Sequence, residues 1–183
     1  MRKRFVLDTN CIIDLEENRP NAVWLCKLVD AWRSGRIDLA VVAVSASENQ
    51  TDGSGGRDYS AFEAKLDLAG LAGIHVLLPL LRWDVSLWDH ALWPSDEMNE
   101  LATRVHQTLF PASSEASPAD AASIPKWRNK LCDAAIAWSC IYHDWRSLVT
   151  RDKNFHHRAA ALRELGLAEI CYPADAVGLC ADI

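Results

Sequence analysis

The sequence lacks most of the features that would assign it to a special class of protein. Its six cysteines include no CxxC pair and no spacing typical of a zinc site, and several lie inside apolar segments, which indicates a reducing, cytoplasmic compartment. The basic start at residues 1–4 is followed by no adequate apolar stretch before Asp8, so no signal peptide is predicted. No run approaches the length of a membrane span, and we therefore expect no membrane partner.

The chain also lacks an excess of positive charge. Its net charge of −6 does not indicate a generic nucleic-acid binder held by long-range attraction. Metal-dependent nucleases are compatible with this charge, because the metal offsets their clustered carboxylates locally. With 183 residues, 50% of them hydrophobic and 24% charged, the chain has the composition of one globular domain with a proper core.

Short apolar runs alternate with amphipathic stretches along the chain. Buried strands are predicted at the apolar runs 4–7, 37–44, 74–78, 147–150 and 167–172. Helices are predicted where apolar residues recur at helical spacing, over 20–33, 59–71, 84–111, 126–143 and 154–165. Loops are predicted at 51–58 and 111–125, and a short tail after residue 172. This alternation predicts an α/β fold, a three-layer α/β/α sandwich around a parallel sheet.

The first strand ends abruptly in a carboxylate. Asp8 follows residues 4–7 directly, and Thr9 or Asn10 can cap the helix that begins there. In open α/β sheets the carboxyl ends of the strands are where ligands bind, which makes Asp8 a candidate site residue. The alternative is that Asp8 merely caps the helix.

Three further carboxylates occupy comparable positions. Glu48 follows the second strand, Asp152 follows the strand at 147–150, and Asp133 lies in the first turns of the most apolar helix. The strand carboxyl ends share one edge of a parallel sheet, and Asp133 can join them if its helix starts there. Converging carboxylates repel one another unless a hard divalent cation, Mg²⁺ or Mn²⁺, binds between them and activates a water molecule. For each carboxylate alone, a helix cap or a surface ion pair remains the alternative.

Four segments together resemble the signature of the PIN-domain family. They are VLDTN at 6–10, Glu48 after residues 41–47, LCDAAIA at 131–137 and LVTRDKNF at 148–155. The resemblance implies a Rossmann-like α/β/α fold and a metal-dependent ribonuclease. It implies that Asp8, Glu48, Asp133 and Asp152 ligate Mg²⁺ or Mn²⁺ for phosphodiester hydrolysis, with Asn10 and Thr150 supporting these ligands.

The same resemblance suggests partners. Many small PIN proteins are toxins of the VapC type, paired with an antitoxin and often dimeric, so RNA, an antitoxin and a second copy of the chain are the expected partners. This chain is longer than those toxins, with a helical and loop insertion at about 82–125, and polar Asn49 and Gln50 follow Glu48. A PIN-like module that binds RNA or protein without cutting is therefore the alternative function.

Basic and aromatic residues flank the predicted site. Candidates for RNA binding are the basic residues close to Asp133 and Asp152, namely Lys126, Arg128, Lys130, Arg151 and Lys153, and the alternative for each is a solvated helix face. Among the tryptophans, Trp88 and Trp93 are candidates for a dimer or partner surface. A dehalogenase-type phosphatase is set aside, because it normally has a second Asp where this chain has Asn10.

Overall fold

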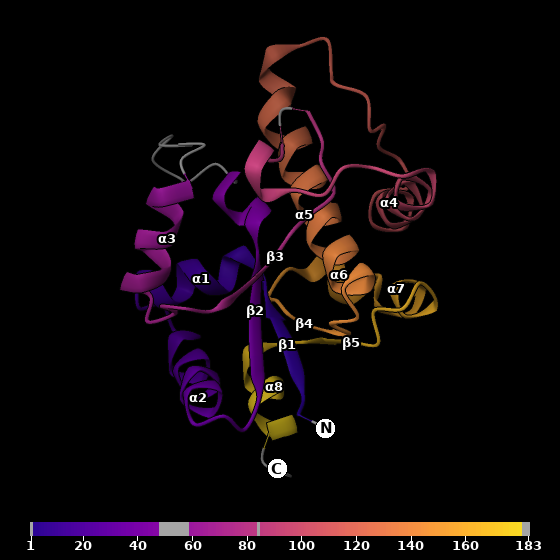
Figure 1. Cartoon of the computed structure of the whole chain (residues 1–183). Coiled ribbons are helices and arrows are strands. Elements are labelled where there is room, and N and C mark those ends of the chain that lie inside the picture. The colour runs from indigo at the N-terminus through magenta and orange to yellow at the C-terminus, as the bar shows by residue number, and fades with distance from the viewer. Residues whose placement is uncertain (1, 48–58, 84, 181–183) are drawn as a thin grey trace.

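A computed structural model of the chain describes residues 2–47, 59–83 and 85–180. At its centre lies a parallel sheet of five strands in the order β3-β2-β1-β4-β5 (Figure 1). The strands are β1 (Arg4–Leu7), β2 (Asp38–Val42), β3 (His75–Leu77), β4 (Ser147–Val149) and β5 (Glu169–Cys171). The first strand of the chain is the middle strand of the sheet.

Eight α-helices cover the sheet in the described part of the chain. The helices on one face are α1 (Thr9–Glu16), α2 (Ala22–Arg33), α3 (Tyr59–Leu68) and α8 (Pro173–Cys180), and those on the other are α4 (Asp96–Leu109), α5 (Ile124–Tyr142), α6 (Lys153–His157) and α7 (Ala159–Glu164) (Figure 1). Short 3-10 turns lie at Ala43–Ser47, Trp88–His90 and Ala121–Ser123. The predicted three-layer α/β/α sandwich is confirmed.

The alternation of side chains along β1 divides the core into two layers. Phe5 and Leu7 pack toward α1, α2 and α8, whereas Val6 packs toward α4 and α5. In register, Val6 lies opposite Ala40 of β2 and Leu148 of β4, and all three are fully buried. A strand that is buried on both faces needs apolar residues throughout, which explains the continuous runs in the sequence.

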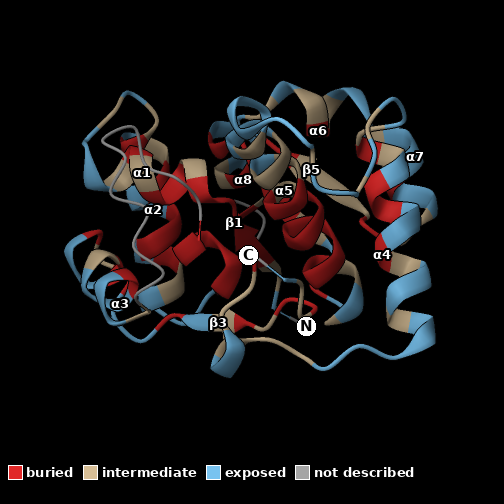
Figure 2. Cartoon of the chain, turned by 90° about the horizontal axis from the view of Figure 1, so that it is seen from above, coloured by how far each residue is buried: buried red, intermediate tan, exposed pale blue. Residues whose placement is uncertain are grey.

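Helix α5 is the most buried helix of the second layer (Figure 2). It lies between the sheet and α4, whose Val105 and Leu109 pack into the same core cluster as β1. The indole nitrogen of Trp138 donates to the carbonyl of Met98 at 3.2 Å, which links α5 to α4. Helix α4, and with it much of the segment at about 82–125, is therefore attached to the central core.

Three of the predicted elements were wrong in extent. The helix expected over 84–111 is an α-helix only from Asp96, because Ser95 accepts a hydrogen bond from the Met98 backbone and begins it there. The helix expected over 154–165 is divided at Arg158 into α6 and α7. The expected tail after 172 contains α8, which packs on α2. The loop at 51–58 lies outside the described residues.

Within the described ranges, no helix is both long enough and apolar enough to cross a membrane.

Candidate functional site

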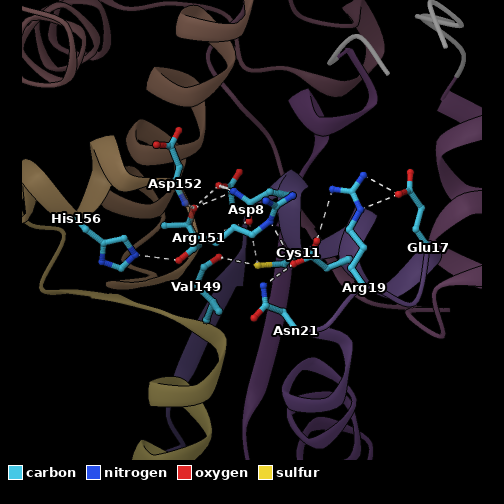
Figure 3. Close-up of polar contacts among 12 residues, drawn as sticks. Asp8, Cys11, Glu17, Arg19, Asn21, Val149, Arg151, Asp152 and His156 are labelled. Carbon is cyan, nitrogen blue, oxygen red and sulfur yellow. Dashed lines mark hydrogen bonds and ion pairs between the residues drawn. The ribbon is translucent and has the colours of Figure 1, made fainter. Parts of the chain in front are cut away.

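The site forms at the carboxyl edge of the sheet, where β1 and β4 end side by side. The backbone N–H of Asp8 donates to the Val149 carbonyl at 3.0 Å, which extends the pairing of the two strands by one residue. Thr150 and Asp152 follow β4 at the same edge. Figure 3 shows Asp8, Arg151 and Asp152 together just beyond Val149.

One oxygen of Asp8 receives two side-chain hydrogen bonds. The Thr150 hydroxyl and the Asn10 amide both donate to Asp8 Oδ2. The Asn10 amide also donates to Thr150 Oγ1 at 3.0 Å, and so does the backbone N–H of Asp152, again at 3.0 Å. Residues 140 or more positions apart in the sequence therefore hold this carboxylate in one orientation.

The helix-cap interpretation of Asp8 does not hold for its side chain. Asp8 occupies the N-cap position of α1, but its carboxylate makes no capping hydrogen bond to the N2 or N3 amide. The expectation that Thr9 or Asn10 caps the helix was wrong, because both lie within α1. The Thr9 hydroxyl instead donates to Ser45 Oγ at 2.7 Å and links the end of β1 to the turn after β2.

Burial makes the charge of Asp8 costly. Only 3% of the residue is exposed, and burial raises its pKa from 3.8 to about 6. The nearby charge of Asp152 raises this pKa too, whereas the hydrogen bonds from Thr150 and Asn10 lower it. The edge thus holds a buried acid beside a second acid, an arrangement that a bound cation stabilises.

Asp152 has a structural role besides any role in the site. Its Oδ1 accepts the backbone N–H of Asn154 at 2.7 Å and caps α6. The helix-cap alternative is therefore realised at Asp152 and not at Asp8. The Asp152 side chain is half-buried, and its second oxygen, Oδ2, lies at the edge of the site.

Of the other two predicted carboxylates, the structure describes Asp133 and not Glu48. Asp133 is half-buried in the middle of α5, not in the first turns as expected, because the helix begins at Ile124. Glu48 lies outside the described residues. Its neighbour Ser47 ends the turn after β2, and Arg128 of α5 donates to the Ser47 carbonyl at 3.3 Å. This bond brings the residue before Glu48 beside the helix that carries Asp133.

The chemistry of the donors suits Mg²⁺ or Mn²⁺. Asp8 and Asp152 offer carboxylate oxygens, which these hard cations prefer. Within the residues that the structure describes, which exclude Glu48, no three or more His, Cys, Asp or Glu side chains form a group that could hold one metal ion. The predicted quartet therefore stays a prediction.

The basic candidates divide by their contacts. The Arg151 guanidinium lies 3.2 Å from a carboxylate oxygen of Asp14. The Lys130 ammonium donates to Ser113 Oγ at 2.9 Å and lies over the Phe110 ring. Lys126 and Lys153 are exposed. These last two are the candidates most open to a phosphate backbone.

Two residues outside the predicted set of site residues lie near the site. Asp14 is 1% exposed, accepts a hydrogen bond from Asn21 at 3.0 Å, and holds Arg151 beside Asn10. His156 contacts the Thr150 carbonyl at 3.0 Å and stacks on Tyr172, which fixes the backbone after β4. A buried Asp in the second turn of an amphipathic helix gives no local signal, because its partners are distant in sequence.

Comparison with known proteins adds no identification. No family model matches the chain, and no curated protein matches it.

Proposed function

We propose that this protein is a Mg²⁺- or Mn²⁺-dependent ribonuclease that hydrolyses RNA phosphodiester bonds. The observation that carries the proposal is the buried Asp8 at the carboxyl end of the central strand, oriented by Thr150 and Asn10 and next to the charge of Asp152. The resemblance of the segments around Asp8, Asp133 and Asp152 to the PIN-domain signature supports the same activity. Asp8, Glu48, Asp133 and Asp152 are the proposed metal ligands.

The proposal assigns separate roles to the bound metal, to the residues around Asp8 and to the exposed lysines. A bound metal would supply positive charge at the scissile phosphate and lower the pKa of a coordinated water. Thr150 and Asn10 occupy Oδ2 of Asp8 and thereby orient Oδ1 for binding. Exposed Lys126 and Lys153 attract the RNA backbone. Because Asp8 binds a cation only as a carboxylate and its pKa is about 6 in the metal-free protein, activity at limiting metal concentration rises with pH through about 6.

The proposal also covers the compartment in which the protein acts and its partners. We place it in the reducing cytoplasm, since the described part of the chain contains no disulfide and five of the six cysteines are buried. We further propose that it acts as the toxin of a toxin-antitoxin pair, with an antitoxin protein and a second copy of the chain as partners.

The test compares the wild-type protein with Asp8→Asn on single-stranded RNA, with Mg²⁺ or Mn²⁺ and with a chelator. We expect the wild type to cleave the RNA when Mg²⁺ or Mn²⁺ is present and not with the chelator, and we expect Asp8→Asn to cleave it in neither case. Asp30→Asn is the matched control, because it removes an exposed carboxylate on α2 far from the site, and it should cleave as the wild type does.

A second measurement distinguishes the proposed ribonuclease from the alternative, a module that binds RNA or protein without cutting. Mn²⁺ should raise the thermal midpoint of the wild type and leave that of Asp8→Asn unchanged. Metal-independent RNA binding without cleavage across varied RNAs would instead establish the non-catalytic module. Growth arrest on expression, relieved by Asp8→Asn, tests the toxin role.

A further inference from the structure

Three tryptophans form an exposed aromatic cluster in the segment between β3 and α4. Trp83, Trp88 and Trp93 are 79%, 57% and 75% exposed, while none of the other five tryptophans is exposed. The rings of Trp83 and Trp88 lie 5.1 Å apart at 80°, and those of Trp88 and Trp93 lie 6.0 Å apart at 62°. With Arg82, Leu87 and Pro94 nearby, they line a cavity of about 600 Å³.

The backbone holds this aromatic cluster in place. Leu92 donates to the Pro79 carbonyl and accepts from the Leu81 amide, both at 2.8 Å, so the two ends of the segment are joined. Ser86 bridges the Arg82 amide, at 3.0 Å, and the Leu80 carbonyl, at 2.9 Å. Exposed rings on a fixed backbone lose little freedom when a partner binds, which is typical of a binding surface.

The segment that carries the aromatic cluster has more acidic than basic residues. Between Arg82 and Glu100 the sequence has five acidic residues and one arginine. That arginine is ion-paired with Glu115 at 2.5 Å, and His90 is stacked on Tyr59. Asp89, next to Trp88, is exposed, and so are the two acidic residues that begin α4 just after Pro94. Such a rim repels a phosphate backbone and attracts cationic side chains.

The area of the cluster sets the size of the partner. The exposed parts of the three rings amount to roughly 300–500 Å², a patch as large as the largest on a typical monomer, which is often functional. A stable dimer buries about 800 Å² on each subunit. The aromatic cluster alone therefore suits a short segment of another protein better than a second copy of this chain.

We propose that the aromatic cluster binds a segment of a partner protein that carries arginine or lysine among apolar residues. Cationic side chains lie over indole faces, the strongest of the aromatic cation sites, while the apolar side chains enter the cavity. Asp89 and the acidic start of α4 pair with the remaining positive charges. This surface uses other residues than the carboxylate site, so its function does not depend on RNA cleavage.

The test uses a synthetic peptide of about ten residues in which arginine alternates with leucine. We expect binding that quenches tryptophan fluorescence and that weakens roughly tenfold or more in the double variant Trp83→Ala/Trp93→Ala, the loss typical of aromatic hot spots. Asp89→Asn should weaken binding a few-fold and reduce its salt dependence. Trp24→Ala, which removes a half-buried ring on α2, is the matched control and should bind as the wild type does.

Other ligands and the chain alone provide the results that would overturn the proposal. Equal binding of a glutamate–leucine or arginine–serine peptide would show that charge and apolar character are not both required. Oligouridylate binding that is lost in the double variant would make the cluster a site for unpaired bases. A concentration-dependent dimer in sedimentation, absent in the double variant, would make it a self-association surface. Circular dichroism establishes that each variant is folded.

Discussion

Replacing Asp8 by asparagine is expected to make the folded protein more stable at neutral and alkaline pH. The asparagine side chain has the same size, and its carbonyl oxygen can accept the hydrogen bonds from Thr150 and Asn10. What the substitution removes is a negative charge that is 3% exposed and close to the charge of Asp152. The direction follows from the cost of holding that charge without a cation.

The magnitude follows from the pKa of Asp8. Burial raises this pKa from 3.8 to about 6, and a tenfold change in acidity corresponds to 1.36 kcal/mol, so ionised Asp8 costs on the order of 3 kcal/mol. The hydrogen bonds to the carboxylate lower this pKa and are therefore already included in that cost. The expected gain is about 2–3 kcal/mol, which is a rise of roughly 4–12 °C in the thermal midpoint of a chain of this size.

The way in which the free energy of unfolding changes with pH shows whether the buried charge of Asp8 is the cause of the stability difference. Between pH 4 and 6 the folded wild type keeps a proton that the unfolded chain has released, so its stability falls as pH rises through this window. Above pH 6 the full cost is present, and below pH 4 it has vanished. The difference between Asp8→Asn and the wild type should therefore be largest at pH 8 and close to zero at pH 4.

Urea denaturation followed by circular dichroism, with a chelator present, measures this difference across the pH range. Asp30→Asn on the exposed face of α2 is the control and should leave the free energy of unfolding within about 0.5 kcal/mol of the wild type. A variant Asp8→Asn that is less stable than the wild type at pH 8, or more stable by the same amount at pH 4 and pH 8, would refute the reasoning. Either result would mean that the charge of Asp8 is well compensated within the protein.

Two other substitutions test the surroundings of the site and of the core. Thr150→Val removes a buried hydroxyl that donates to Asp8 and accepts from the Asp152 amide, so it should cost about 1–3 kcal/mol in urea denaturation, more at pH 8 than at pH 4; Thr150→Ser keeps the hydroxyl and should cost less than about 1 kcal/mol. Leu109→Ala in α4 should cost about 2–5 kcal/mol within a single cooperative transition, because Leu109 packs in the same cluster as Val6; a separate transition for α4 would contradict this.

The strands and the layers could be predicted because burial on both faces leaves a direct trace in sequence. Continuous apolar runs marked β1 and β2, and the placement of Asp8 at a strand end followed from them. The start of α4 also had a local signal, since Ser95 precedes two acidic residues as a helix cap does, but the helical spacing of apolar residues before it was given more weight. Helix α8 begins with Pro173, which is a favoured first residue.

The contacts of the site could not be predicted from local patterns. The bond between Thr150 and Asp8 joins residues 142 positions apart, and it exists because β4 lies beside β1 in the sheet. The same holds for Arg151, which appeared in sequence as a basic residue available to RNA and instead pairs with buried Asp14. Strand order decides both contacts, and a single sequence does not contain it.

Asp8 carries more functional information than the other carboxylates, because its local structural role does not require a charge. At Asp152 the carboxylate caps α6 through Asn154, so an aspartate there is explained even without a metal. At the start of α1, by contrast, a side chain that makes no capping hydrogen bond is buried, ionisable and next to another acid. An asparagine would satisfy Thr150 and Asn10 at lower cost. A carboxylate that destabilises the fold at neutral pH, held by two donors from separate elements, is what a cation-binding function requires.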